Sequence, residues 1–197
     1  MGKVDYNTFI AMLSELNDFI YKWDRDYVLE VKAIGGFAII VHRQMKHIDT
    51  PRTESRDIDS LTKDYPEPII KEIFRIGKKY GADDPDGWLN NHWNQTKQYQ
   101  EEFEYFIKWQ SLDLNLSNIL VYYCDLEALL MFKLRAIDDR INIQKLEPRP
   151  QDVMDVLSIL KAFGEKDILH VKNEWIASSI QYFPSAVFYI HKECYET

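Results

Sequence analysis

One short stretch constrains the fold of this chain more than any other: an apolar segment that runs into two glycines and continues as apolar sequence. Residues 27–34 are rich in β-branched side chains and partly alternate, which predicts a strand. Gly35 and Gly36 end that strand, and residues 37–45 predict a helix. Such a turn lets a phosphate approach the backbone at the start of the helix. An ordinary tight turn has the same composition, so the sequence here leaves both interpretations open.

A second motif follows, in which Asp57 and Asp59 flank one isoleucine. Residues 57–62 predict a strand, and side chains two apart on a strand project from the same face. Two neighbouring carboxylates repel each other, and a divalent cation such as Mg²⁺ relieves that repulsion. A solvated strand edge also tolerates this pattern, so alone the motif indicates a metal site only weakly.

The remaining pattern predicts a mixed α/β fold followed by a helical region. Strands are expected at residues 100–109, where apolar and polar residues alternate, and at residues 119–124, which form a continuous apolar run typical of an interior strand. Three- and four-residue spacing of apolar positions predicts helices over 5–23, 65–77, 88–93, 126–141, 151–163, 166–181 and 185–195. The change in pattern near residue 125 predicts a domain over 1–125 and a helical C-terminal region over 126–197 packed on it.

Composition narrows the class of protein. The chain has 197 residues, 46% of them hydrophobic, which fits a globular protein of one or two domains. The net charge of −8 argues against a generally basic nucleic-acid binder. Cys124 and Cys194 lack metal-ligand spacing, and no apolar run is long enough to span a membrane, so we expect a reduced, cytoplasmic protein without a membrane partner.

The order of these motifs resembles the nucleotidyltransferase (polymerase-beta-like) superfamily. The segments IGGFAIIVHR and RTESRDIDSLT are similar to the opening of AbiEii-type toxins and of related uncharacterised bacterial nucleotidyltransferase-like proteins. DDPDGWLNNHW, DLEALLMFKLRAIDDR and RPQDVMDVLSIL resemble later blocks of that group. The resemblance covers residues 28–160 and implies a mixed-sheet nucleotidyltransferase domain with a C-terminal helical region.

The resemblance also implies roles for individual residues. Gly35 and Gly36 would face the phosphates of an NTP, and Asp57 and Asp59 would bind Mg²⁺. Lys133 would reach the triphosphate, although a surface lysine between apolar neighbours fits the same sequence. Asp152 or Asp155 matches a later acidic position, where a helix also favours an acid at its first turn. Arg52 and Arg56 would hold phosphate or would only balance the two aspartates.

Two departures from the family pattern affect the predicted site. The family often has Gly-Ser where this chain has two glycines followed by Phe37, and Asp57 comes 21 positions after Gly36, further than in compact members. No third carboxylate is placed securely: Glu102, Glu104 and Asp113 are the candidates, and we assign Asp113 a catalytic role because apolar residues flank it.

The predicted activity is Mg²⁺-dependent transfer of NMP from an NTP to an RNA, protein or small-molecule acceptor. The resemblance to toxins suggests a tRNA or protein acceptor and a component of a toxin–antitoxin or phage-defence pair, with an antitoxin protein as partner. The alternative is a catalytically inactive protein of the same fold that acts in protein interaction or nucleotide sensing.

Overall fold

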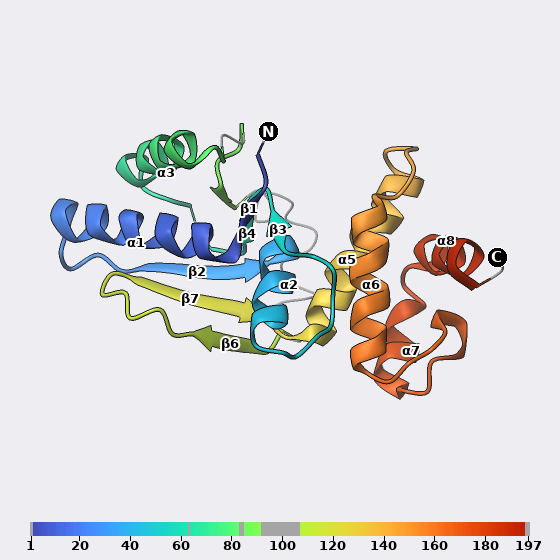
Figure 1. The fold of residues 1–197 in the computed structure, drawn as a ribbon. Coiled ribbons are helices and arrows are strands. Elements are labelled where there is room, and N and C mark those ends of the chain that lie inside the picture. The colour runs from blue at the N-terminus through green and yellow to red at the C-terminus, as the bar shows by residue number, and fades with distance from the viewer. Residues whose placement is uncertain (1, 63, 83–84, 92–106, 196–197) are drawn as a thin grey trace. The chain divides into compact units, whose positions relative to one another are not determined.

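The computed structural model describes residues 2–62, 64–82, 85–91 and 107–195 (Figure 1). The chain divides into two compact units. The first comprises Met1–Val41 and Thr53–Asp125, and the second comprises His42–Arg52 and Leu126–Thr197. The sequence did not indicate that residues 42–52 belong with the C-terminal helices. Among the described residues, no helix is long and apolar enough to cross a membrane.

A five-stranded sheet is the centre of the first unit. Its strands are β2 (Leu29–Ile34), β4 (Ile58–Ser60), β5 (Leu89–Asn90), β6 (Trp109–Leu112) and β7 (Ile119–Cys124). They lie in the order β5-β4-β2-β7-β6. The β2–β7 and β4–β5 pairs are parallel, whereas β2–β4 and β6–β7 are antiparallel, so the sheet is mixed. The predicted α/β class with a mixed sheet is therefore confirmed, and β7 occupies the interior position that its apolar sequence predicts.

Helix α1 (Tyr6–Trp23) supplies much of the apolar core of this unit. Asp5 caps its N-terminus by accepting a hydrogen bond from the backbone N–H of Thr8 at 2.8 Å. Its apolar positions recur every three or four residues, and they are buried along one face: Phe9, Met12, Leu13, Leu16 and Ile20. A two-stranded ribbon that the sequence did not predict, β1 (Val4–Asp5) with β3 (Glu54–Ser55), ties the start of α1 to the segment before β4.

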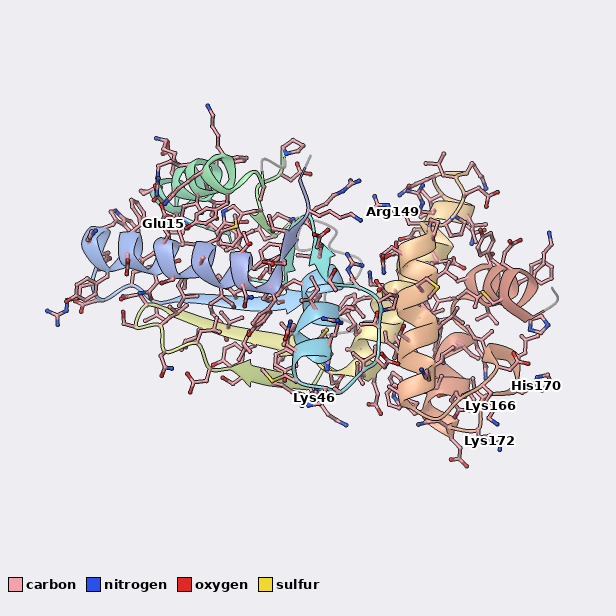
Figure 2. All side chains as sticks on the ribbon, in the orientation of Figure 1. Glu15, Lys46, Arg149, Lys166, His170 and Lys172 are labelled. Atoms are coloured by element: carbon pink, nitrogen blue, oxygen red, sulfur yellow. The ribbon has the colours of Figure 1, made fainter. Side chains whose placement is uncertain are left out.

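Helix α3 (Glu67–Tyr80) packs against α1. It ends at Gly81, whose φ of 74° is the left-handed conformation that closes many helices. Glu15 of α1 faces α3 (Figure 2) and accepts hydrogen bonds from Arg75 at 2.5 Å and from Lys79 at 2.6 Å. These bonds lower the pKa of Glu15 to about 2, with the Lys79 bond the largest cause and Arg75 the next.

The second unit contains α5 (Leu126–Asn142), α6 (Pro150–Ala162), a short 3-10 helix η2 (Ile168–His170), α7 (Glu174–Ile180) and α8 (Pro184–Tyr195). Helix α5 packs against α6 and α8. The single helix predicted over 166–181 is wrong. The carboxylate of Glu165 accepts hydrogen bonds from the backbone N–H groups of Lys172 and Asn173, which turns the chain, and Asn173 then caps α7.

Two further expectations near the site differ from the structure. The helix expected over 88–93 is replaced at Leu89–Asn90 by strand β5, because these residues pair with β4. Helix α2 (Gly35–Gln44) begins at the first glycine rather than after the second. The strand expected over 100–109 lies mostly outside the described residues, and β6 begins at Trp109.

Candidate functional site

The glycine turn and the aspartate pair meet at one edge of the sheet in the first unit. Ile34, the last residue of β2, pairs with Asp59 of β4. Because β2 and β4 are antiparallel, Asp57 lies just beyond the end of β2, where the chain turns at Gly35 into α2. Asp59 of β4 and Asp57, which directly precedes this strand, lie on one side of the chain, whereas Ile58 between them is fully buried on the other. The register therefore brings together residues more than 20 positions apart in the sequence.

Gly35 is fitted closely against Asp59. Its φ is 66°, a backbone conformation that residues other than glycine rarely adopt. A Cβ atom added to Gly35 would overlap Oδ2 of Asp59, so the carboxylate occupies the space that a side chain would fill. The carboxylate thus lies beside the first residue of α2, where the helix macrodipole favours negative charge. That location suits the anionic side chain itself, and it also suits a phosphate group.

Asn90 completes this face of the sheet, and the sequence did not single it out. It is 5% exposed, it pairs in parallel register with Asp59, and its Nδ2 donates a hydrogen bond to Oδ2 of Asp57 at 3.0 Å. A signal was available in the sequence: Leu89 and Asn90 follow a turn-rich segment, as the first residues of a strand often do. The interpretation of residues 88–93 as a helix hid it.

The donor set at this edge fits a hard divalent cation. Mg²⁺ is usually bound by one or two carboxylates together with waters and substrate phosphates, rather than by a complete cage of protein ligands. Asp57 and Asp59 supply two such carboxylates on one face, and both are half-buried. Within the described ranges, no three His, Cys, Asp or Glu side chains come together as a metal site.

The structure does not bring Asp113 to this edge. Leu112 pairs with Val121, which is level with Val31 of β2, so Asp113 lies near the start of β2 and the aspartate pair near its end. Strand spacings then separate Asp113 from Asp59 by roughly 19 Å. Asp113 is exposed and accepts a hydrogen bond from the backbone N–H of Asn115 at 3.1 Å, which makes it a turn residue. Glu102 and Glu104 lie outside the described residues.

Asp125 is an acidic residue at the correct end of the sheet that the sequence interpretation overlooked. It follows the last residue of β7, level with Gly35, and is 8% exposed. Two strand spacings place its backbone roughly 10 Å from that of Asp59, and among the described residues it does not join the aspartate pair in a group of three possible metal ligands. Its Oδ2 accepts a hydrogen bond from the backbone N–H of Lys108 at 3.3 Å, where β6 and β7 meet.

Most of the other residues that the sequence predicted for the site belong to the second unit. Lys133 of α5 is 6% exposed and forms ion pairs with Asp152 at 2.7 Å and with Asp155 at 2.8 Å. Arg52 pairs with Asp155 at 2.6 Å. Two cations and two anions therefore neutralise one another inside this unit, and Lys133 is a buried ion-pair partner rather than a surface lysine. This arrangement explains why residue 52 groups with α5 and α6.

Gly36 and Arg56, the last two predicted residues, lie in the first unit. Gly36 is buried within the first turn of α2. Arg56 is exposed and makes no ion pair in the part of the chain that the structure describes, so it does not balance the charge of Asp57 or Asp59 through a direct contact.

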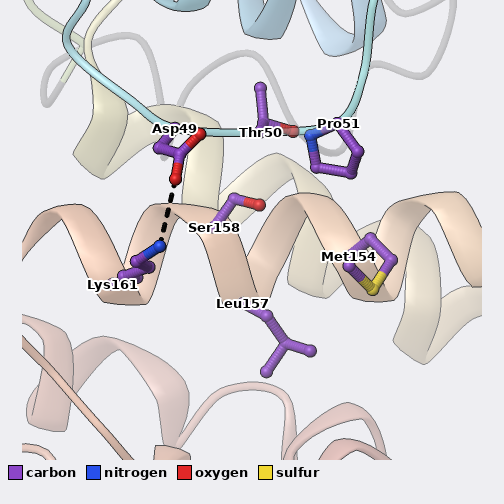
Figure 3. Close-up of a pocket in the computed structure, with 7 residues that line it drawn as sticks. All are labelled: Asp49, Thr50, Pro51, Met154, Leu157, Ser158 and Lys161. Carbon is purple, nitrogen blue, oxygen red and sulfur yellow. Dashed lines mark hydrogen bonds and ion pairs between the residues drawn. The ribbon is translucent and has the colours of Figure 1, made fainter.

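A hollow of about 410 Å³ lies in the second unit between the segment 49–51 and α6 (Figure 3). Met154 and Leu157 are among its apolar lining residues, and the side chains of Asp49 and Lys161 form an ion pair at 3.1 Å at one end. None of the residues predicted from the sequence lines this hollow, so it is separate from the candidate site.

The two units differ in charge. Of the 24 basic and 32 acidic residues, 12 of each kind lie in the second unit, so the first unit carries the whole net charge of −8. The exposed side chains of Lys166, His170 and Lys172 extend from the segment around η2 (Figure 2), but acidic residues accompany them in the sequence. Net charge therefore gives neither unit the excess of basic residues typical of nucleic-acid-binding domains.

No protein-family model matches the chain, and no curated protein matches it. Among solved structures, the chain is similar to the crystal structure of an antigenic nucleotidyltransferase-like protein from Paracoccidioides brasiliensis, with 12% identity, a TM-score of 0.47 and coverage of 100% of both chains.

Proposed function

We propose that the first unit binds an NTP together with Mg²⁺ and transfers NMP to an acceptor, so that the chain acts as a nucleotidyltransferase. The observation that carries this proposal is the meeting of Asp57, Asp59 and the Gly35 turn at one edge of a mixed sheet. The sequence segments that hold these three residues are also the ones that most resemble the nucleotidyltransferase superfamily.

The residues of the chain would contribute binding and orientation. Asp57 and Asp59 would hold Mg²⁺, and backbone N–H groups at the start of α2 would face the β- and γ-phosphates. When bound, Mg²⁺ would stabilise the negative charge that develops on the phosphate oxygens as pyrophosphate leaves. The acceptor oxygen would attack the α-phosphorus, and the products would be the NMP-modified acceptor and pyrophosphate.

A second candidate function has an observation in its favour. The neighbour of the aspartate pair on β5 is the amide of Asn90, which does not act as a base, and no third acidic ligand joins the pair among the described residues. A protein with this site would bind Mg²⁺ and an NTP without transferring the nucleotide, as a nucleotide sensor does. The two candidates predict the same binding and differ only in whether a labelled product forms.

The test is label transfer from α-³²P-labelled NTPs, one at a time, in the presence of Mg²⁺ and cell extract. The wild-type protein should label an RNA, a protein or a small molecule, and the double substitution Asp57→Asn/Asp59→Asn should abolish the labelling. Mg²⁺-dependent NTP binding without transfer would favour the sensor. The absence of both transfer and binding would refute the nucleotide site.

The chain offers a matched control for this test. Asp24 and Asp26 have the same spacing as the site pair, but they are exposed in the turn after α1. The double substitution Asp24→Asn/Asp26→Asn changes net charge equally and should leave labelling unchanged. The toxin role is tested separately: expression of the wild type in a bacterial host should arrest growth, and expression of the Asp57→Asn/Asp59→Asn variant should not.

A further inference from the structure

The hydrogen bond from Asn90 to Asp57 has a consequence for which cation the site would accept. The donor is a buried amide on β5, and the acceptor is Oδ2 of a carboxylate that lies just before β4. Because β4 and β5 are hydrogen-bonded neighbours with Asp59 opposite Asn90, the backbone fixes the place of the amide. The orientation of the Asp57 carboxylate is thereby coupled to the sheet.

Carboxylates bind divalent cations in two ways. Ca²⁺ takes six to eight oxygen ligands and often chelates both oxygens of one carboxylate, whereas Mg²⁺ requires near-octahedral geometry and bonds to single oxygens. A cation that chelates both oxygens of Asp57 shares Oδ2 with the Asn90 N–H and weakens that hydrogen bond. A cation that bonds through Oδ1 alone leaves that hydrogen bond in place.

We infer that Asn90 is a positioning residue that makes Asp57 a one-oxygen ligand and so favours Mg²⁺ or Mn²⁺ over Ca²⁺. This inference rests on the proposed function, since it assumes that Asp57 and Asp59 bind a cation. It adds a metal selectivity and assigns that selectivity to a residue outside the aspartate pair. A buried amide that only satisfied the sheet would contribute to stability and would leave the preference between cations unchanged.

Two substitutions change the hydrogen bond in different ways. Asn90→Leu removes the donor and keeps the number and branching of the side-chain heavy atoms. Asn90→Asp keeps the shape but replaces the donor with a third carboxylate beside Asp57. The loss of one hydrogen bond of about 1 kcal/mol corresponds to roughly a fivefold change in an equilibrium constant. Asn90→Leu should therefore reduce the preference for Mg²⁺ over Ca²⁺ by about fivefold, and Asn90→Asp should reduce it further while strengthening the binding of both cations.

Direct metal binding is the readout. Mn²⁺ alone is titrated into the full-length protein and followed by electron paramagnetic resonance, and Mg²⁺ or Ca²⁺ is then added to displace it. Asn91→Leu is the control, because this adjacent residue also carries an amide, which donates a hydrogen bond to Oδ1 of Asp64 at 3.4 Å. Circular dichroism establishes that each variant is folded. If Asn90→Leu does not fold, the smaller Asn90→Ala variant, which also removes the donor, takes its place in the test.

The outcomes separate the inference from the proposed function. Mn²⁺ binding that is lost in Asp57→Asn/Asp59→Asn, with a Mg²⁺ preference that falls in the Asn90 variants and not in Asn91→Leu, supports the inference. Mn²⁺ binding that depends on the aspartate pair, with the same Mg²⁺ preference in the wild type and both Asn90 variants, overturns the inference and leaves the metal site in place. Mn²⁺ binding unaffected by Asp57→Asn/Asp59→Asn overturns both.

Discussion

Replacing Gly35 by alanine tests the close fit between the glycine turn and the aspartate pair. The added methyl group has two separate effects. The backbone at Gly35 has a φ of 66°, which costs a residue with a Cβ about 1–2 kcal/mol. The methyl group would also overlap Oδ2 of Asp59, so that side chain must leave its rotamer at a further cost of about 0.5–1.5 kcal/mol.

A matched substitution separates these two effects. Gly81 has a φ of 74°, and no atom lies within 4 Å of the position that its Cβ would occupy. Gly81→Ala therefore carries the backbone cost without the overlap, and both variants gain about 0.4–1 kcal/mol from a less flexible unfolded chain. We expect Gly81→Ala to lower the free energy of unfolding by about 1 kcal/mol and Gly35→Ala to lower it by about 2 kcal/mol.

Urea unfolding at pH 7 measures these differences, and Mn²⁺ titration measures the effect on the site. Displacement of Asp59 should weaken Mn²⁺ binding in Gly35→Ala by at least tenfold, since one of two carboxylate ligands moves. Gly81→Ala should bind Mn²⁺ as the wild type does. If Gly35→Ala unfolds at the same urea concentration as Gly81→Ala and keeps its affinity for Mn²⁺, then Gly35 and Asp59 are not closely fitted and Asp59 is not a ligand positioned by the glycine turn.

Three further predictions concern the rest of the molecule. Glu15→Gln should lower the free energy of unfolding by about 1 kcal/mol at pH 7, because its partners are half-exposed and screened. The pKa of Glu15 is about 2 in the folded state and 4.5 in the unfolded state, so this contribution is complete above pH 4.5 and should disappear as the pH falls towards 2. Urea unfolding that shows the same stability difference between wild type and Glu15→Gln at pH 7 and near pH 2 would contradict this prediction. Lys133→Met leaves Asp152 and Asp155 buried with Arg52 as the remaining cation and should lower the free energy of unfolding by about 3–5 kcal/mol. A loss of NTP affinity with unchanged stability would instead assign Lys133 to nucleotide binding. Asn118→Ala removes a buried amide that bonds to two backbone carbonyls and should cost about 2–3 kcal/mol; a thermal melt with an unchanged midpoint would refute that role.

Much of the fold follows from local sequence pattern. Period and composition predict β7 and the helices α1, α5, α6 and α8 to within a few residues, because each has a long apolar stripe or a continuous apolar run. The short elements are different. Strand β5 has two residues, and only its pairing with β4 makes it a strand, so no local pattern specifies it.

The candidate site divides in the same way. The glycine turn and the aspartate pair have a recognisable local sequence, and their meeting follows from the pairing of β2 with β4. Asp113 shows the limit of local reasoning, because its apolar neighbours are compatible with either end of a strand and only the register decides which end it occupies. Asp24 and Asp26 make a related point, since they share the spacing of the site pair but follow a helix.

The grouping of His42–Arg52 with Leu126–Thr197 has a consequence for how this protein is made and divided. The second unit is discontinuous, so an eleven-residue segment emerges from the ribosome long before the helices that it joins. Arg52, the cation paired with the fully buried Asp155, comes from that early segment. A fragment that begins at Leu126 would lack this cation, and limited proteolysis within residues 45–52, after the end of α2, would cut the C-terminal unit while leaving its helices intact.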